Sequence, residues 1–330
     1  MKVIEHYDNA KEPLISFEII PPKRGKSAKE IFDAVEKMME VNPPFIDVTY
    51  HAAEATFEEL PDGTVKRHIK RKRPGTIGLC AAILHRFNVD PVPHLICEGF
   101  TKEESEDALI ELNYLGIDNV LAIRGDASGV PQNYRKNGTV NKNAIDLVKQ
   151  IHKMNRGIYL EEIANADPTD FCIGVAGYPE KHFEAPNLDW DIQRLKEKVA
   201  AGADYIVSQM FYDNQAYFNF EKKCREAGIE VPIVPGIKII SSTRHLTSLP
   251  KYFHLSIPDP LANEVISNPD RVIDVGVEWG IEQCTELLEH GVPGLHFYVM
   301  GDPQPALDVI KKLPAGSSVP SGSRVKARKG

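Results

Sequence analysis

The stretch Phe17-Glu18-Ile19-Ile20-Pro21-Pro22 is a short apolar run that carries one carboxylate and ends at a pair of prolines. Runs of this length are typical of buried strands. Comparable apolar runs that end in polar side chains recur at residues 46–50, 93–95, 121–126, 175–180 and 206–209. In a parallel barrel the carboxyl ends of the strands meet at one mouth, where such folds carry out chemistry. We therefore expect these polar side chains to share one site.

Helix-like segments separate the apolar runs. Residues 28–41 place Ile31, Ala34, Val35 and Met38 on one face. Thr101-Lys102-Glu103-Glu104 matches a capping box at the start of another helix. Strands are expected at 14–20, 45–49, 92–96, 119–123, 171–176, 205–209, 233–235 and 294–299, and helices at 28–41, 76–84, 101–115, 144–154, 190–201, 215–227, 271–289 and 304–312. This alternation predicts an α/β fold, a single-domain (β/α)8 TIM barrel over residues 1–313.

Two segments do not fit the alternation. Pro61-Asp62-Gly63 lies between β-compatible residues and predicts a hairpin insertion at about 56–73. Its second arm, residues 66–73, is strongly basic, which fits either a solvated arm or a contact with a cofactor phosphate or a neighbouring subunit. The tail at 314–330 is rich in Ser, Gly, Lys and Arg and is predicted to be disordered.

Composition excludes several classes of protein. The net charge of -8 argues against a nucleic-acid surface, and no apolar run approaches the length of a membrane span. The N-terminus has no apolar signal core. The cysteines are five in number and lack metal or redox spacing, so we expect buried thiols in a reducing cytoplasm and no metal site. No Gly-rich dinucleotide fingerprint follows any strand.

Glu18 and the Arg124-Gly125-Asp126 turn are the first candidates for chemistry. A carboxylate on a core strand is unfavourable unless it is paired or functional. Glu18 could therefore be a general acid at the mouth or a structural salt-bridge partner. Arg124 suits a phosphate or carboxylate, Gly125 allows close approach of a ligand, and Asp126 can stabilise positive charge. The alternative for these three residues is an ordinary surface turn.

Gln209 and His94 are further candidates. Gln209 ends the apolar run Tyr205-Ile206-Val207-Ser208 and suits hydrogen bonding to a polar heterocycle, although a satisfied core amide would look the same. His94 follows Pro93 and could contact a ligand or belong to the core.

The ordered set of motifs resembles the 5,10-methylenetetrahydrofolate reductase family over roughly residues 14 to 312, in its bacterial form with the catalytic domain only. The matching segments are Phe17-Glu18-Ile19-Ile20-Pro21-Pro22, Val48-Thr49-Tyr50, Pro93-His94-Leu95, Arg124-Gly125-Asp126, Tyr178-Pro179-Glu180 with His182, Gln209 with Phe211 and Asp213, Pro235-Gly236-Ile237, and His296-Phe297-Tyr298.

The resemblance implies an oxidoreductase with non-covalent FAD that uses NAD(P)H, in a ping-pong reaction, to reduce methylenetetrahydrofolate to 5-methyltetrahydrofolate for one-carbon metabolism and methionine supply. It implies that Glu18 is the general acid, that Asp126 stabilises the cationic folate intermediate and that Gln209 contacts folate and nicotinamide. It also implies a cytoplasmic homo-oligomer. The positions that match flavin contacts are Thr49, Tyr50, His94, Arg124, Gly125, Asp126, Ala144, Tyr178, His182, Ala185, Asp191, Arg194 and Lys198.

The chain departs from the family pattern at four positions. Among the substrate-binding positions, Leu249 replaces an aromatic residue and His245 replaces a glutamine. Asp302 stands where an arginine follows the last strand, and Arg194 stands where an asparagine contacts the flavin. The alternative function is a non-catalytic or flavin-free folate- or pterin-binding barrel that acts with partner proteins.

Overall fold

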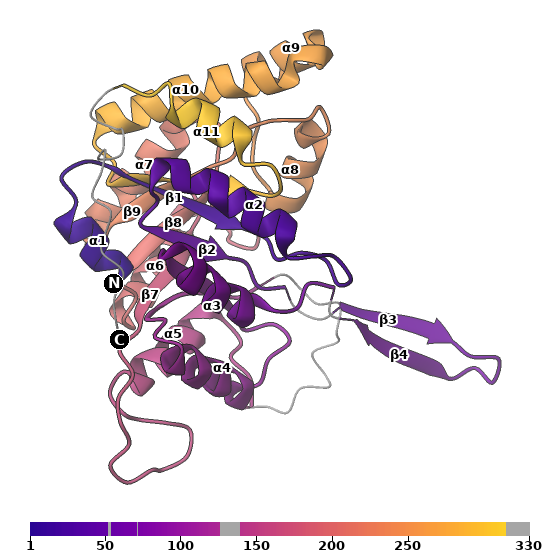
Figure 1. Ribbon diagram of the computed structural model, residues 1–330, viewed down its shortest axis with the longest axis vertical. Coiled ribbons are helices and arrows are strands. Elements are labelled where there is room, and N and C mark those ends of the chain that lie inside the picture. Colours follow the sequence, from indigo (N-terminus) through magenta and orange to yellow (C-terminus); the bar gives the residue numbers. More distant parts are fainter. Residues whose placement is uncertain (52–53, 71, 126–138, 315–330) are drawn as a thin grey trace.

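The computed structural model describes residues 1–51, 54–70, 72–125 and 139–314. In these residues parallel strands close into one barrel in the order β1, β2, β5, β6, β7, β8, β9 and β10, with β10 returning to β1 (Figure 1). The strands are β1 (Leu14–Ile19), β2 (Phe45–Val48), β5 (Asp90–Ile96), β6 (Asn119–Ile123), β7 (Cys172–Gly177), β8 (Tyr205–Met210), β9 (Ile233–Ile237) and β10 (Gly294–Val299). The prediction of a single-domain TIM barrel is confirmed.

Helices cover the outside of the barrel. The expected ones are α2 (Lys29–Met38), α3 (Thr76–Phe87), α4 (Lys102–Tyr114), α5 (Ala144–Met154), α6 (Leu188–Ala200), α7 (Asn214–Glu226), α10 (Val272–His290) and α11 (Gln304–Ile310). The capping box of α4 forms as predicted, with Glu104 N donating to Thr101 Oγ1 at 3.1 Å and Thr101 N donating to Glu104 Oε2 at 2.7 Å. Phe17, Ile19 and Phe297 point outward from their strands into the core between barrel and helices.

Three helices were not expected from the sequence: α1 (Val3–Asn9), α8 (His245–Phe253) and α9 (Asp259–Ser267). Each has at most nine residues, and α8 contains Pro250. Helices this short carry little periodic signal, and proline normally argues against a helix interior. Together α8 and α9 fill the connection between β9 and α10 (Figure 1).

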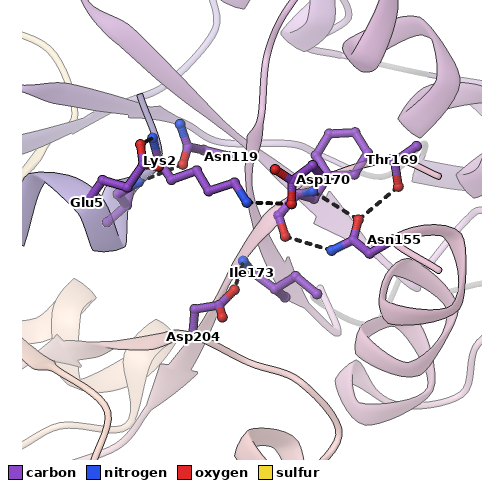
Figure 2. Close-up of polar contacts among 10 residues, drawn as sticks. Lys2, Glu5, Asn119, Asn155, Thr169, Asp170, Ile173 and Asp204 are labelled. Carbon is purple, nitrogen blue, oxygen red and sulfur yellow. Dashed lines mark hydrogen bonds and ion pairs between the residues drawn. The ribbon is translucent and has the colours of Figure 1, made fainter.

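Helix α1 closes the amino-terminal end of the barrel. Val3 is fully buried against an apolar cluster that includes Phe45, Leu121 and Tyr205. Asn119, the first residue of β6, accepts a hydrogen bond from Val3 N at 2.7 Å and donates to Met1 O at 3.0 Å. Lys2 Nζ pairs with Asp170 at 2.5 Å beside them (Figure 2). The amino-terminal end of the barrel is therefore covered by α1.

The insertion after β2 is an antiparallel hairpin of β3 (Glu54–Glu59) and β4 (Val65–Lys70) that projects away from the barrel (Figure 1). Glu58 lies opposite Lys66 in the register, and its carboxylate accepts from His68 Nε2 at 2.8 Å. The base is tied to the loop after β1, because Arg73 Nη1 donates to Pro21 O at 2.5 Å. Glu58 of β3 thus pairs with one residue of the basic arm, His68.

Candidate active site at the barrel mouth

Glu18 lies near the carboxyl end of β1 and faces the barrel interior, with Asp47 and Tyr298 beside it in the register. Its side chain keeps 13% of its surface exposed. Two imidazoles approach the same carboxylate oxygen, Oε2: His94 Nε2 at 3.5 Å and His296 Nε2 at 3.7 Å. The carboxylate is therefore the exposed member of a cluster that is otherwise buried.

Asp47 on β2 is the register neighbour of Glu18 in the same cluster and is fully buried. Its Oδ2 lies 3.4 Å from His94 Nε2, close enough for an ion pair but without hydrogen-bond geometry. Neither oxygen of Asp47 and neither ring nitrogen of His94 has a hydrogen-bond partner among the described residues. Burial lowers the pKa of His94, but the charges of Glu18 and Asp47 outweigh that effect and raise it above its usual value.

The wall of the mouth next to β1 is built by β10, β9 and β8. The Tyr298 hydroxyl donates to Ser208 O at 2.7 Å, and Gly236 N donates to Ser208 Oγ at 2.9 Å. A side chain at Gly236 would collide with the Ser208 carbonyl oxygen and the Tyr298 ring, so only glycine fits there. His296 completes this wall, with Nδ1 2.9 Å from Ser16 Oγ.

Gln209 follows Ser208 at an irregularity in the pairing of β8 with β9. Its side-chain Oε1 accepts from Met210 N at 2.9 Å, while its NH2 group donates to none of the described residues. The amide is thus fixed in place and retains a free donor.

A second group of predicted residues lies after β6 and β7. Arg124 Nη1 pairs with Glu184 at 2.5 Å, and the Tyr178 and His182 rings meet edge to face at 4.8 Å. His182 N donates to Asp191 Oδ2 at 2.7 Å. Burial, together with the charge of Arg124, lowers the pKa of His182. This group combines cations with aromatic faces.

Lys198 on α6 belongs to the same side of the barrel. Its Nζ donates to Ala176 O on β7 at 2.6 Å, and burial lowers its pKa to about 8. Gly125 has a φ of 82°, and an added Cβ would lie 3.1 Å from Ile96 Cβ. The backbone after β6 therefore requires glycine both for its conformation and for the close contact.

The remaining predicted positions are more dispersed. Thr49 Oγ1 donates to Ile19 O at 2.9 Å, and Tyr50 packs edge to face on Phe100. Ala185 is buried, and Ala144 is the first residue of α5. Arg194 pairs with Glu197 at 2.7 Å on the surface of α6. These contacts hold Thr49 and Tyr50 at the mouth, whereas Arg194 is engaged on its own helix.

The substrate positions around α8 differ in their surroundings. Leu249 is 2% exposed and packs in an apolar cluster with Tyr212 and Leu261. His245 Nδ1 accepts from Ser241 N at 3.2 Å, and burial with the nearby charge of Lys238 lowers the pKa of His245 to about 4. Lys238 follows β9, and its Nζ donates to Tyr298 O at 3.2 Å.

The family model for methylenetetrahydrofolate reductase matches residues 2–314. The chain belongs to this reductase family. Methylenetetrahydrofolate reductase 2 of Saccharomyces cerevisiae is 30% identical over 319 residues, which are 94% of this chain and 49% of the yeast protein. The 5,10-methylenetetrahydrofolate reductase of Salmonella typhimurium is 30% identical over 292 residues, which are 87% of this chain and 86% of that protein. The chain spans about half the length of its eukaryotic relatives.

A solved structure shares the fold of this reductase family member. It is described as an uncharacterized protein from Clostridium thermocellum that binds two copies of 5-methyl-5,6,7,8-tetrahydrofolic acid. The TM-score is 0.59 at 16% identity, with 93% of this chain and 97% of that chain covered. At this identity the likeness shows the barrel architecture alone.

The structure adds to the candidate site three residues that the sequence did not single out. Asp47 and His296 both lie within strand segments quoted above. An ionisable residue in an apolar strand is the signal that identified Glu18, and the same signal could have identified these two residues. Lys238 carries no such signal, because it follows the end of β9. Asp126, predicted as a catalytic residue, lies outside the described residues.

None of the helices that the structure describes combines the length and the apolar character of a membrane span. Among the same residues, no group of three or more His, Cys, Asp or Glu side chains is placed to hold a metal ion. All five cysteines are free and buried, as predicted.

Proposed function

We propose that this chain reduces 5,10-methylenetetrahydrofolate to 5-methyltetrahydrofolate with electrons from NAD(P)H, and so serves one-carbon metabolism and methionine supply. The observation that carries the proposal is Glu18. It is the exposed carboxylate of a buried polar cluster at the mouth of a barrel whose sequence matches the reductase family. Names of relatives that specify NADH and NADPH support a nicotinamide donor without selecting one.

In this proposal Glu18 acts as the general acid. It donates a proton to the folate nitrogen that leaves when the five-membered ring opens, which prepares the one-carbon unit for reduction. Gln209, with its free NH2 donor, orients the heterocycle. Asp126 stabilises the positive charge on the opened folate. His245 and Leu249 are the further substrate-binding positions proposed on α8, where Leu249 is 2% exposed and belongs to an apolar cluster.

The residues after β6 and β7 fit a non-covalent FAD. Its pyrophosphate requires cations, which Arg124 and Lys198 supply, and its rings suit the aromatic faces of Tyr178 and His182. When bound, this cofactor supplies the hydride-carrying chemistry. Arg124 must leave Glu184 to reach a phosphate, so the Glu184 carboxylate occupies the position on Arg124 that a phosphate oxygen would take. The other proposed flavin positions are Thr49, Tyr50, His94, Gly125, Ala144, Ala185, Asp191 and Arg194.

The cellular location and the oligomeric state are part of the same proposal. The five buried free thiols support a reducing, cytoplasmic location. A homo-oligomer is inferred from the resemblance to the family.

The test is the visible spectrum of the purified protein, followed after addition of NADH or NADPH and then of methylenetetrahydrofolate. We expect a yellow protein that bleaches with the nicotinamide and regains its colour with the folate. A colourless protein that cannot be reconstituted with FAD, yet binds the folate, would favour the flavin-free binding barrel. Protein that takes up neither ligand would refute both functions.

A further inference from the structure

A cavity of about 520 Å³ lies outside the candidate active site. It is bounded by α7, α9 and α10, of which α10 packs on the other two, and by the loops that follow β7 and β8 (Figure 1). None of the residues that line it is a candidate catalytic, substrate or flavin position. Its volume is in the range of sites that hold a small molecule. The chemistry of its walls therefore indicates what it can bind.

The walls of this cavity are acidic. Five carboxylate side chains line it, and no Lys, Arg or His side chain does. All except Glu180 are exposed, so water keeps them ionised at neutral pH. Among the residues that the structure describes, no cation forms an ion pair with any of the five. The five are Glu180, Asp213, Asp259, Glu282 and Glu286. The cavity therefore presents a concentration of uncompensated negative charge.

Two of these carboxylates are oriented by backbone N–H groups. Glu180 Oε2 accepts from Ser256 N at 2.9 Å, and Asp213 Oδ1 accepts from Gln215 N at 2.9 Å at the start of α7. A carboxylate can accept several hydrogen bonds, so both residues retain the capacity to bind a ligand. Part of the acidic wall is thus held in place by the fold.

One face of α10 contributes to the wall. Trp279, Gln283 and Glu286 are spaced at i, i+4 and i+7, so they lie on one side of the helix. Trp279 Nε1 donates to Tyr212 O at 3.3 Å, and Gln283 Nε2 donates to Phe211 O at 2.9 Å. These two bonds fix the face of α10 against the segment that follows β8. An indole ring in such a wall attracts a cation that lies over its face.

A buried amide in the same wall lacks a donor. Asn214 is 7% exposed, and its Nδ2 donates to Gln283 O at 3.0 Å and to Glu286 Oε2 at 2.6 Å, on two residues that line the cavity. These two acceptors fix which end of the amide is the nitrogen. The other end, Oδ1, has no hydrogen-bond partner among the described residues, and neither has the hydroxyl of Tyr212, which also lines the cavity and is 3% exposed. Buried acceptors are normally satisfied, so a ligand with N–H groups would supply what Asn214 lacks.

A ligand that matches these walls carries positive charge and several N–H donors. A single ammonium group would leave most of the five carboxylates unanswered. Ile257 and Pro258 add an apolar portion to the wall, which suits methylene groups. We propose that the cavity binds a small linear polyamine, in which short methylene chains join several ammonium groups. The ammonium groups meet the carboxylates and Asn214 Oδ1, and the methylene chains lie along the apolar portion. This inference goes beyond the proposed function and does not depend on folate reduction.

A metal ion fits the same walls less well. Hard divalent ions require several oxygen ligands that converge on one point. In the part of the chain that the structure describes, no group of three or more His, Cys, Asp or Glu side chains is placed to hold a metal ion. The carboxylates are therefore spread around the cavity, as the separated charges of a polyamine require.

Isothermal titration calorimetry with spermidine at low ionic strength is the central test. The full-length wild-type protein should bind one spermidine per chain. Glu282→Gln combined with Glu286→Gln removes two charges from the cavity but keeps hydrogen-bond acceptors, and it should weaken binding by about 10-fold or more. Absence of binding by the wild-type protein would overturn the proposal.

The matched control is Glu278→Gln combined with Glu289→Gln. Both residues lie on α10 but do not line the cavity, so the helix and the change in net charge are the same as in the test variant. Spermidine binding should stay within about 2-fold of wild type, because solvent and salt screen these more distant charges. An equal loss in both double variants would show that spermidine responds to net charge alone, and the assignment to the cavity would be wrong.

The emission of Trp279 locates the ligand. The chain has two tryptophans, so Trp190→Phe leaves Trp279 as the sole tryptophan. Spermidine should change the emission of Trp279 with the same midpoint as the calorimetric titration. In Trp279→Phe, the emission of Trp190, which is 46% exposed on α6, should not respond. An unresponsive Trp279 at saturating spermidine would place the ligand elsewhere and contradict the proposal.

Competition distinguishes a polyamine site from a site for divalent cations. Mg²⁺ should displace spermidine no better than NaCl at the same ionic strength, because both salts then act by screening. Selective displacement by Mg²⁺ would refute the polyamine assignment. None of these measurements requires turnover, so a failure of the reductase function would appear separately, in the half-reactions.

Discussion

The two ends of the barrel use polar residues in opposite ways. At the closed end, Asn119 bonds Val3 N and Met1 O, and Lys2 pairs with Asp170 (Figure 2). At the mouth, Asp47 and His94 are buried as deeply as Asn119 but have no hydrogen-bond partners among the described residues. Satisfied polar groups stabilise a fold, whereas unsatisfied ones reduce its stability. The satisfied polar groups of the closed end therefore stabilise the fold. The unsatisfied groups at the mouth lower its stability, as is common at functional sites.

The pKa values of two lysines show the same difference between the two ends of the barrel. Partial burial of Lys2 at the closed end lowers its pKa, but the hydrogen bond and the charge of Asp170 outweigh burial. The pKa of Lys2 is therefore raised. Lys238 at the mouth donates to the Tyr298 carbonyl oxygen and has no carboxylate beside it among the described residues, so burial lowers its pKa to about 8. The lowered pKa of Lys238 thus reflects burial of a cation that has no carboxylate beside it among the described residues.

The largest expected effect comes from Glu18→Gln, which removes the acid but keeps its shape. Folate reduction should fall by roughly 10²-fold or more, the scale of a general acid. Flavin reduction by the nicotinamide needs no proton on the folate and should persist. Stopped-flow measurement of each half-reaction provides the check. Equal losses in the two halves would remove Glu18 from this role and weaken the contrast between the two ends.

The second prediction concerns Lys238→Met. The unfolded chain holds the Lys238 proton up to its ordinary pKa of 10.5, whereas the folded protein releases it at about 8. Burial of this cation is therefore unfavourable below pH 8, and the penalty fades as the pH rises from about 8 to 10.5. Lys238→Met should increase the free energy of unfolding at pH 7 by up to about 3 kcal/mol.

Denaturant unfolding at pH 7 and pH 10 checks this prediction, because the gain should shrink at the higher pH. Lys2→Met is the matched control and should lower stability slightly, since it breaks a surface ion pair. If Lys238→Met is less stable than the wild-type protein at pH 7, then the interactions of Lys238 are more favourable than its one hydrogen bond to Tyr298 O indicates.

The third prediction tests the closed end. Asn119→Ala removes the acceptor for Val3 N and the donor to Met1 O, and it leaves the buried Val3 N without a partner. The free energy of unfolding should fall by about 1–3 kcal/mol. Both half-reactions should keep their rates in protein that is folded. A selective loss of folate reduction in this variant would mean that the two ends are coupled.

The smallest effect is expected in the hairpin, which belongs to neither end. Glu58 and His68 are exposed, so breaking their contact should change stability by less than about 1 kcal/mol. Lys66→Gln with His68→Gln should leave the Michaelis constants and the particle mass unchanged across salt concentrations. A higher Michaelis constant with a flatter salt dependence would instead identify the arm as a contact for an anionic substrate. A smaller particle would identify a subunit contact.

Much of the barrel was predictable because its strands are short apolar runs between amphipathic helices. The boundaries of β1, β6 and β10 differ from the expected ones by no more than one residue. Helices α1, α8 and α9 were missed, since short helices are specified by the surfaces on which they pack. Val3 and Leu249, for example, are buried by tertiary contacts that local sequence does not reveal.

The site was predictable only in part. Glu18 stood out as a charge in an apolar strand, and Asp47 carries the same signal at the same depth. The sequence could not show that one nitrogen of His94 lies between these two carboxylates, because that depends on the closure of the barrel. Lys238 and the pairing of Arg124 with Glu184 likewise depend on how neighbouring loops meet.

Ser16 and His296, which touch within the mouth, are separated by 280 positions along the chain. At translation rates of about 5–20 residues per second, roughly 15 to 55 seconds pass between their syntheses. During that interval β1 has no β10 to pair with, and Glu18 and Asp47 can remain hydrated in an open precursor. Pairing of β10 with β1 closes the barrel around these charges, so a nascent chain that lacks β10 has an incomplete mouth.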